Sequence, residues 1–212
     1  MSHYAHAWIW FAVGSLATFT CNLAAVAGQY NEVLSIGDAA PAWKQLPGVD
    51  GKQHSLDDLK DRDVVVVAFT CNSCPVAVDY EDRLIALANK YAGPQGRVAV
   101  VAINVTKVPD DRLPKMQERA TAKRFTFPYL FDETQQIARD YGAVFTPHFF
   151  VLNRARKVVY MGGMDDNSNP TLVKTHYVEP AIDAALRNET PATTEALARG
   201  CLIRWDRTRR RN

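Results

Sequence analysis

The stretch Val64–Ala77 most constrains how this chain folds, because an apolar run meets two cysteines and a proline there. Residues Val64–Phe69 are apolar without alternation and mostly β-branched, a pattern typical of a strand buried on both faces of a parallel or mixed sheet. After Pro75, apolar and charged side chains follow a helical spacing, and proline is tolerated in the first turn of a helix. The stretch therefore predicts a strand, a loop that contains Cys71 and Cys74, and a helix.

Cys71 and Cys74 lie where the predicted helix begins, and this position has chemical consequences. The unpaired backbone N–H groups and the positive dipole end of a helix N-terminus favour a thiolate over a thiol. A permanent structural disulfide across so short a loop would gain little stability. A metal-binding pair would need two further ligands, and covalent haem attachment would need His in place of Pro75. The pair is therefore interpreted as a redox site that needs no dissociable cofactor and no metal.

The N-terminal segment, residues 1–27, contains no Lys, Arg, Asp or Glu and includes the apolar series Trp8–Val13. The tripeptide Ala25-Val26-Ala27 before Gly28 matches the small-x-small pattern of a signal-peptide cleavage site. An uncleaved anchor is the alternative, since residues 7–27 are just long enough to span a slightly thinned bilayer. We therefore expect an exported protein, periplasmic or extracytoplasmic, with or without a membrane tether.

The rest of the chain alternates between strand and helix patterns. Strand patterns cover residues 98–104, 128–132, 144–152 and 157–161, and helix patterns cover residues 112–124, 134–141 and 177–186. The last two strand patterns flank a turn and predict an antiparallel hairpin, and Thr134 is expected to cap the helix that Gly142 ends. We expect an α/β fold with a mixed central sheet flanked by helices, formed by a domain over residues 28–187. Residues 188–212 are expected to form an irregular arm with a basic tail.

Basic residues gather in this tail, and the five arginines there are Arg204, Arg207, Arg209, Arg210 and Arg211. No basic helix accompanies them, so a solvated tail is favoured over a contact with lipid or nucleic acid. The formal net charge of the whole chain is +2, which gives no reason to expect a nucleic-acid partner.

Three separated features coincide in this sequence. They are the dithiol motif Cys71-Asn72-Ser73-Cys74, the dipeptide Thr146-Pro147 before a strand, and the hairpin strand that leads into Gly162–Asn167. Over about residues 33–186 the chain resembles the thioredoxin fold, and specifically the redoxins related to peroxiredoxins, the alkyl hydroperoxide reductase and thiol-specific antioxidant superfamily. The resemblance implies a cis Thr146–Pro147 peptide bond that sets a backbone edge beside the dithiol for substrate pairing.

The chain also departs from the peroxiredoxin pattern, which carries a Pro, a Thr or Ser and a Cys at fixed spacing. The dipeptide Cys74-Pro75 resembles the peroxidatic Cys-Pro, but Thr70 sits one residue too early and Val67 stands where the pattern has Pro. The peroxidatic constellation is therefore incomplete, whereas the dithiol of thioredoxin type is intact.

These observations favour an exported thiol–disulfide oxidoreductase in which Cys71 attacks a disulfide and Cys74 resolves the mixed disulfide, with Thr146 and Pro147 shaping the docking edge. The expected partners are thiol or disulfide proteins and a partner reductant. One alternative is a thiol peroxidase in which Cys74 forms a sulfenic acid and Cys71 resolves it. A further alternative is a copper-binding module of thioredoxin fold with Cys71, Cys74 and His148 as ligands.

Three other residues have roles that the sequence leaves open. Glu81 falls about two turns after Cys74, either near the dithiol or on a solvated helix face. His148 follows Pro147 and is either a base or ligand near the site or a structural residue. Cys201 is the odd thiol of the mature chain, and it is a third redox residue, a mixed-disulfide site, an intermolecular bridge or a buried small hydrophobe.

Overall fold

The computed structural model describes residues 28–91 and 96–206, which form a central sheet with helices on both sides. The predicted signal or anchor segment and the last six residues of the basic tail lie outside the described residues. The strands are β1 Leu46–Pro47, β2 Gln53–His54, β3 Val64–Phe69, β4 Val98–Asn104, β5 Tyr129–Phe131, β6 Phe145–Thr146, β7 His148–Leu152, β8 Val158–Gly162 and β9 Cys201–Leu202. The α-helices are α1 Pro75–Asp79, α2 Glu81–Tyr91, α3 Leu113–Lys123, α4 Gln136–Asp140 and α5 Val178–Leu186, and the 3₁₀ turns are η1 Leu56–Leu59, η2 Pro109–Asp111 and η3 Pro170–Leu172.

The five-stranded central sheet has the order β5-β4-β3-β7-β8, with β3 in the middle. Strands β3, β4 and β5 are parallel, and β7 and β8 are antiparallel to their neighbours. Val66 pairs with Val100 of β4 on one side and with Val151 of β7 on the other. The mixed sheet and its closing hairpin are therefore as the sequence predicted.

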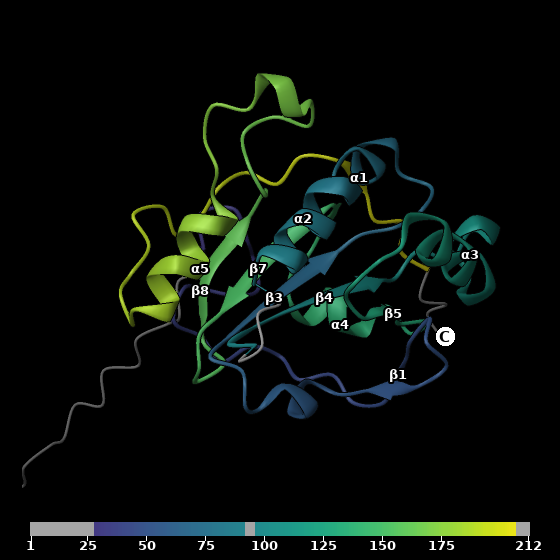
Figure 1. Ribbon diagram of the computed structural model, residues 1–212, viewed down its shortest axis with the longest axis horizontal. Coiled ribbons are helices and arrows are strands. Elements are labelled where there is room, and N and C mark those ends of the chain that lie inside the picture. Colours follow the sequence, from purple (N-terminus) through teal and green to yellow (C-terminus); the bar gives the residue numbers. More distant parts are fainter. Residues whose placement is uncertain (1–27, 92–95, 207–212) are drawn as a thin grey trace, which may run out of the picture.

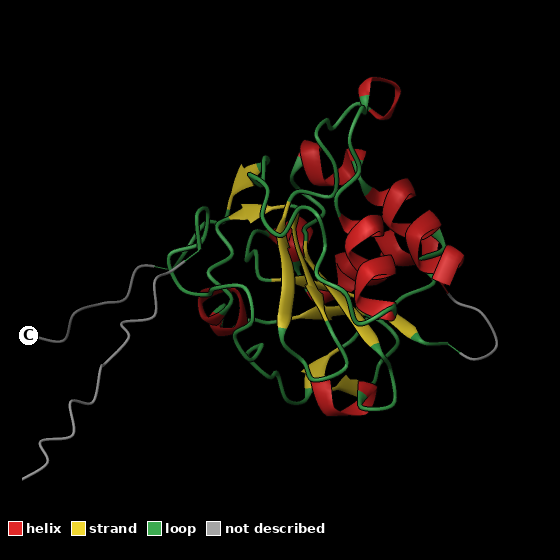
Figure 2. Cartoon of the chain, turned by 90° about the vertical axis from the view of Figure 1, so that its left-hand side faces the viewer, coloured by secondary structure: helices red, strands yellow, loops and turns green. Residues whose placement is uncertain are grey.

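Both faces of β3 are buried, because alternate residues enter two separate hydrophobic clusters. Val64 and Val66 belong to a cluster with residues of α2, α3 and α5, and Val65 and Val67 belong to one with Trp43 and residues of α4. Figure 1 shows α2 and α5 in front of the sheet and α4 behind it, and Figure 2 shows the helices on the two sides of the strands. This two-sided burial explains why the strand carries no polar alternation.

Two helix boundaries differ from the sequence prediction. The helix expected to follow Pro75 is divided at Tyr80 into α1 and α2, whose backbones meet there at an αR residue. The helix expected to be capped by Thr134 begins at Gln136, with Gln135 as its N-cap in a left-handed conformation with φ of 62°. The Thr134 hydroxyl still accepts the Gln136 amide at 3.2 Å. The side chain that accepts the Ile137 amide is that of Asp132 at 2.9 Å, so a carboxylate one turn upstream satisfies this helix end.

The C-terminal arm follows α5 and crosses the molecule rather than extending from it. Figure 1 shows it in yellow, running from the side of α5 across the upper end of the sheet to the side of α3. Within it, Cys201 and Leu202 form β9, which pairs antiparallel with β6 in a two-stranded sheet. The arm was expected to be irregular, and this strand is an addition that the structure reveals.

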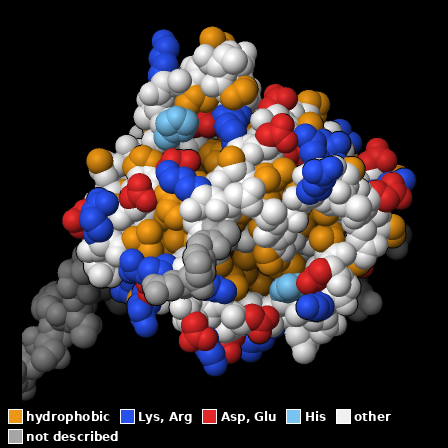
Figure 3. All heavy atoms as spheres, in the orientation of Figure 1, with side chains coloured by type: hydrophobic (Ala, Val, Ile, Leu, Met, Phe, Trp, Pro, Cys, Tyr) orange, Lys and Arg blue, Asp and Glu red, His pale blue; other side chains and the backbone are white. Residues whose placement is uncertain are grey.

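The surface carries charges of both signs side by side. Figure 3 shows basic and acidic side chains interspersed over one face. Ion pairs such as Lys90 with Glu179 and Lys123 with Asp82 join charges of opposite sign. No helix within the described residues is both long and apolar enough to cross a membrane.

Candidate active site

The dithiol motif lies at the carboxyl end of β3, where the chain turns into α1. Cys74 is the N-cap of α1, with Pro75 in the first helical position, and the Ala77 amide donates to its Sγ at 3.4 Å. Both cysteine side chains are covered: 5% of Cys71 and 2% of Cys74 is exposed. The sequence placed both cysteines at a helix N-terminus correctly, and the structure shows that Cys71, the expected attacking thiol, is buried.

Thr146 contacts both sulfur atoms from the opposite side of the site. Its Oγ1 lies 3.4 Å from the Sγ of Cys71, and its carbonyl oxygen lies 3.1 Å from the Sγ of Cys74. The hydroxyl is able to donate to a Cys71 thiolate, and the carbonyl accepts from Cys74 only when that residue is a thiol. The Thr146–Pro147 peptide bond is cis, as the resemblance implied.

The disulfide in this structure joins Cys74 to Cys201, and Cys71 is a free thiol. The two bonded residues have Cα atoms 5.9 Å apart and are 127 residues apart in the sequence. The sequence predicted a Cys71–Cys74 pair instead and left the role of Cys201 open. The structure therefore assigns Cys201 to the site, and the three sulfurs form one cluster with Ala77.

A buried carboxylate holds the loop between the two cysteines. The amides of Asn72 and Ser73 donate to Oδ1 of Asp111 at 2.5 and 3.2 Å, and the Ser73 hydroxyl donates to Oδ2. Asn104, at the end of β4, donates to the same Oδ1 at 3.2 Å. Asp111 is fully buried, so these donors replace the water that its charge would otherwise bind. Sequence reasoning missed this residue, because nothing in its local pattern marks it.

Tyr129 of β5 links the same loop to the sheet. Its hydroxyl donates to Oδ1 of Asn72 at 3.1 Å and accepts from Nδ2 of Asn104 at 3.2 Å. Burial, with the nearby negative charges of Cys71 and Asp111, raises the pKa of Tyr129 well above its usual range. The phenol therefore stays a neutral hydrogen-bond donor at any physiological pH.

Glu81, at the start of α2, is neither solvated nor bonded to a cysteine. It is buried and accepts two hydrogen bonds from the Arg119 guanidinium, at 2.8 and 2.7 Å. With Cys71, Tyr129 and Pro147 it lines a small pocket on the α2 side of the sheet. The carboxylate therefore forms part of the surroundings of Cys71, but its own partner is Arg119.

His148 is buried on the other face of the sheet. It pairs with Phe69 in the β3–β7 register, and its ring stacks on Phe150, with centroids 4.7 Å apart. Burial lowers the pKa of His148 to about 4, and its Nδ1 has no hydrogen-bond partner. The ring is therefore neutral near pH 7, and its stacking favours the structural interpretation over a base near the dithiol.

The described residues contain no group of three or more His, Cys, Asp or Glu side chains arranged to hold a metal ion. Of the three ligands that the copper alternative requires, Cys74 is already bonded to Cys201, and His148 packs against Phe150. The arrangement of these side chains therefore gives the copper alternative no support.

Residues 36–161, more than half of the chain, match the AhpC/TSA family. Two proteins from strains of Mycobacterium tuberculosis, named as candidate peroxiredoxins, are each 31% identical to this chain over 114 residues. That match covers 52% of this chain and 65% of each relative, so about a third of the length of these relatives is unmatched.

Solved structures extend the comparison to the whole fold. A hypothetical protein from Sinorhizobium meliloti 1021 has a TM-score of 0.76 and 34% identity, covering 84% of this chain and 98% of that chain. A candidate thioredoxin from Neisseria meningitidis has a TM-score of 0.55 and 22% identity, covering 71% of this chain and 93% of that chain. These likenesses confirm the predicted thioredoxin-like fold. Because the family match spans the sheet, the dithiol loop and the hairpin together, this chain belongs to the AhpC/TSA family.

Proposed function

We propose that this protein is an exported thiol–disulfide oxidoreductase whose substrates are protein disulfides. Cys71 is the attacking thiol, Cys74 is the resolving thiol, and a separate thiol protein supplies the electrons. One observation carries the proposal: strand β6, next to the dithiol, pairs with an extended segment that presents a cysteine to Cys74.

Backbone pairing at β6 is a general way to hold a substrate strand. Thr146 pairs with Cys201, and Phe145 pairs with Leu202, so main-chain pairing holds this segment in addition to the disulfide of Cys201. An edge of this kind accepts many sequences, because the backbone groups are common to all of them. This arrangement suits an enzyme that acts on disulfides in different proteins.

The exchange proceeds in two balanced steps. The Cys71 thiolate attacks one sulfur of the substrate disulfide, and the other substrate sulfur leaves as a thiolate and takes up a proton. The Cys74 thiolate then attacks the Cys71 sulfur, the mixed disulfide breaks, and the second substrate thiolate leaves. Two substrate thiols and a Cys71–Cys74 disulfide result, and the partner reductant restores the dithiol.

The surroundings of both sulfurs support these roles. The Thr146 hydroxyl is placed to donate to a Cys71 thiolate, and the Ala77 amide donates to Cys74 at the N-terminus of α1. Hydrogen bonds to a charged sulfur favour the thiolate form, which is the nucleophile in disulfide exchange.

The test is the reduction of insulin with dithiothreitol as the electron source, followed by the turbidity of the released B chain. We expect the wild-type protein to accelerate the reaction and both Cys71→Ser and Cys74→Ser to abolish the acceleration. Cys21→Ser, in the N-terminal segment, is the matched control and keeps the wild-type rate. Equal rates for wild type and Cys71→Ser would overturn the proposal.

A second candidate, a thiol peroxidase, is favoured by one observation: Cys74 precedes Pro75 at a helix N-terminus and accepts a backbone N–H, and the chain has relatives named as candidate peroxiredoxins. In this reaction a peroxide oxidises the Cys74 thiolate to a sulfenic acid, and a second thiol condenses with it to a disulfide and water. Stopped-flow mixing of the reduced protein with hydrogen peroxide tests it. Fast oxidation that survives Cys71→Ser and disappears in Cys74→Ser would favour the peroxidase over the oxidoreductase.

Export is part of the proposal and rests on the composition of residues 1–27, which the structure does not describe. Expression of the full chain in a bacterial host, with separation of periplasmic, membrane and cytoplasmic fractions, tests it. Recovery in the cytoplasmic fraction alone would contradict export.

A further inference from the structure

We propose that Cys201 is the third redox-active residue of this site, carried by a strand that binds β6 in the manner of a protein substrate. The proposal rests on the proposed exchange function. It adds Cys201 as a redox residue, a closed state in which β9 covers the dithiol, and extended cysteine-containing segments as the substrate class. A disulfide between Cys74 and Cys201 that serves only to stabilise the fold is the competing explanation.

Strands β9 and β6 are in close backbone contact. Besides the two paired residues, the Ile203 amide donates to the Val144 carbonyl at 2.9 Å. A Cβ atom on Gly200 would lie 2.0 Å from the Thr146 carbonyl oxygen. Real Cβ atoms do not approach backbone oxygens so closely. The residue before Cys201 must therefore be glycine for β9 to pair with β6 in this way.

Hydrogen bonds hold the arm on both sides of this strand, and exposed and buried side chains alternate between them. On one side the Ala196 amide donates to the Met161 carbonyl at 3.1 Å, and on the other the Asp206 amide donates to Oε1 of Gln135 at 2.8 Å. Between them, Leu197 is half exposed and 69% of Leu202 is exposed. Lifting of the stretch that bears Cys201 from β6 would uncover the buried side chains of Ala198 and Ile203, while both ends of the arm stay attached.

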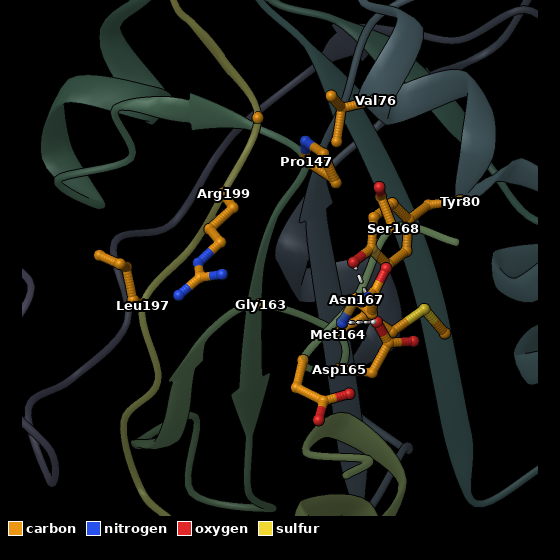
Figure 4. A pocket seen from close by; sticks show the side chains of 12 residues that line it. Val76, Tyr80, Pro147, Gly163, Met164, Asp165, Asn167, Ser168, Leu197 and Arg199 are labelled. Carbon is orange, nitrogen blue, oxygen red and sulfur yellow. Dashed lines mark hydrogen bonds between the residues drawn. The ribbon is translucent and has the colours of Figure 1, made fainter. Parts of the chain in front are cut away.

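A pocket with a volume of about 240 Å³ lies beside this stretch. Figure 4 shows Leu197 and Arg199 of the arm on one side of it and Val76 and Pro147 on the other. The arm thus forms one side of the pocket, and Val76 and Pro147, which lie close to the dithiol, form the other. Lifting of the stretch that bears Cys201 would open the pocket onto β6 and make a groove for an extended chain.

When β9 is paired with β6, a protein substrate cannot reach the dithiol. β6 is already paired, and Cys71, the proposed attacking thiol, is buried. A substrate strand and β9 compete for the same backbone groups of Thr146. The register of β9 also indicates the substrate class: an extended segment with a cysteine opposite Thr146.

The opening step is an exchange among the three sulfurs. The Cys71 thiolate attacks the Cys74 sulfur, a Cys71–Cys74 bond forms, the Cys74–Cys201 bond breaks, and Cys201 leaves as a thiolate that takes up a proton. One disulfide is present before and after, so the step needs no external oxidant or reductant. The partner reductant of the proposed function then reduces the Cys71–Cys74 disulfide, which supplies the Cys71 thiolate that attacks a substrate. The shared contacts of Cys71 and Cys74 with Thr146 keep the first two sulfurs close to each other.

The first experiment maps the disulfides by peptide mass spectrometry after acid quenching of the full-length protein, equilibrated in glutathione buffers of graded ratio. We expect both Cys74–Cys201 and Cys71–Cys74 linkages in the wild-type protein, and Cys74–Cys201 alone in Cys71→Ser. Detection of Cys74–Cys201 as the sole intramolecular linkage at every ratio would make it a structural disulfide and would overturn the proposal.

The second experiment separates the seating of the strand from the thiol chemistry, using Gly200→Ala, which keeps all three cysteines. Because the added methyl group collides with Thr146, we expect iodoacetamide to modify Cys71 about tenfold faster than in the wild-type protein, the change that follows from losing roughly one strand hydrogen bond. Leu202→Ser, at the exposed neighbouring position, is the matched control and keeps the wild-type rate. Equal Cys71 reactivity in Gly200→Ala and wild type would overturn the closed state.

The insulin assay tests the role of Cys201 separately from the proposed exchange function. Faster insulin reduction by Gly200→Ala and by Cys201→Ser than by wild type supports both. Two interconverting linkages in a protein that never reduces insulin would leave Cys201 redox-active and remove the proposed function. Insulin reduction at the same rate in wild type and Cys201→Ser would retain the function and overturn the role of Cys201.

Discussion

Asp111 and Ser73 are joined by two hydrogen bonds, one from the Ser73 amide and one from its hydroxyl, to separate oxygens of the same buried carboxylate. Through this pair, a 3₁₀ turn between β4 and α3 fixes the conformation of the loop between Cys71 and Cys74. The loop is thereby held by a part of the chain that lies almost forty residues downstream.

Asp111→Asn tests this support. The amide has a single acceptor oxygen, so at least one of the three loop donors loses its partner, and we expect unfolding free energy to fall by about 2 kcal/mol. Urea denaturation followed by tryptophan fluorescence measures it. Asp110→Asn is the matched control, since the Asp110 side chain is exposed and only its backbone carbonyl meets the loop. Equal effects of the two substitutions would contradict the role of Asp111.

Thr146→Val tests the hydrogen bond to Cys71 while nearly conserving volume. Without the hydroxyl that lies 3.4 Å from Sγ, a Cys71 thiolate loses a donor, and we expect the rate of insulin reduction to fall about tenfold. Thr70→Val, beside Cys71 in the chain, is the control and should stay near the wild-type rate. A wild-type rate for Thr146→Val would mean that the hydroxyl does not assist the thiolate.

His148 predicts a pH dependence of stability. Burial lowers its pKa from 6.5 to about 4, so between these values the unfolded chain binds a proton that the folded protein does not. The contribution of His148 to the free energy of unfolding is therefore complete above pH 6.5. It is lost as the pH falls toward 4, by about 3 kcal/mol in total.

The variant His148→Phe isolates this contribution, because phenylalanine keeps the stacking on Phe150 and does not titrate. We expect unfolding free energy to fall less between pH 6.5 and 4 in this variant than in the wild-type protein. His176→Phe, at an exposed position, is the control and keeps the wild-type profile. Parallel pH profiles for wild type and His148→Phe would exclude a buried neutral histidine.

Substitution of Gly162 tests how closely the arm packs against β8. This glycine has φ of +143°, and a Cβ atom there would lie 2.0 Å from the Ala196 carbonyl oxygen. We expect Gly162→Ala to lower unfolding free energy by more than about 2 kcal/mol, from backbone strain and the collision together. Gly51→Ala carries the strain alone, because φ is +77° there with open space around it, and should lower it by about 1 kcal/mol. Similar losses at both positions would show that the arm does not press on Gly162.

The sequence predicted the parts of the fold and site that local pattern determines. The unbroken apolar run of Val64–Phe69 specified a doubly buried strand, and Pro75 specified the start of the helix that Cys74 caps. The Thr146–Pro147 bond and the closing hairpin followed from resemblance and from the turn signal, and both are present.

The parts that it did not predict depend on contacts between distant segments. Asp111 is one of two adjacent aspartates in a polar turn, and only the folded chain distinguishes the buried one from the exposed one. Glu81 was expected to face solvent or the dithiol, but its partner Arg119 lies on a different helix. The pairing of Cys201 with Cys74 depends on β9 meeting β6, and a strand of two residues has too little sequence to leave a pattern.

Cys201 lies 127 residues after Cys74 and close to the end of the chain. Ribosomes make a protein from its N-terminus, so β3, α1 and the two loop cysteines emerge well before β9. During that interval Cys74 has Cys71 as its neighbour and β6 has no partner strand. Every newly made molecule therefore passes through a stage with its dithiol uncovered, and its site closes only after β9 has been made.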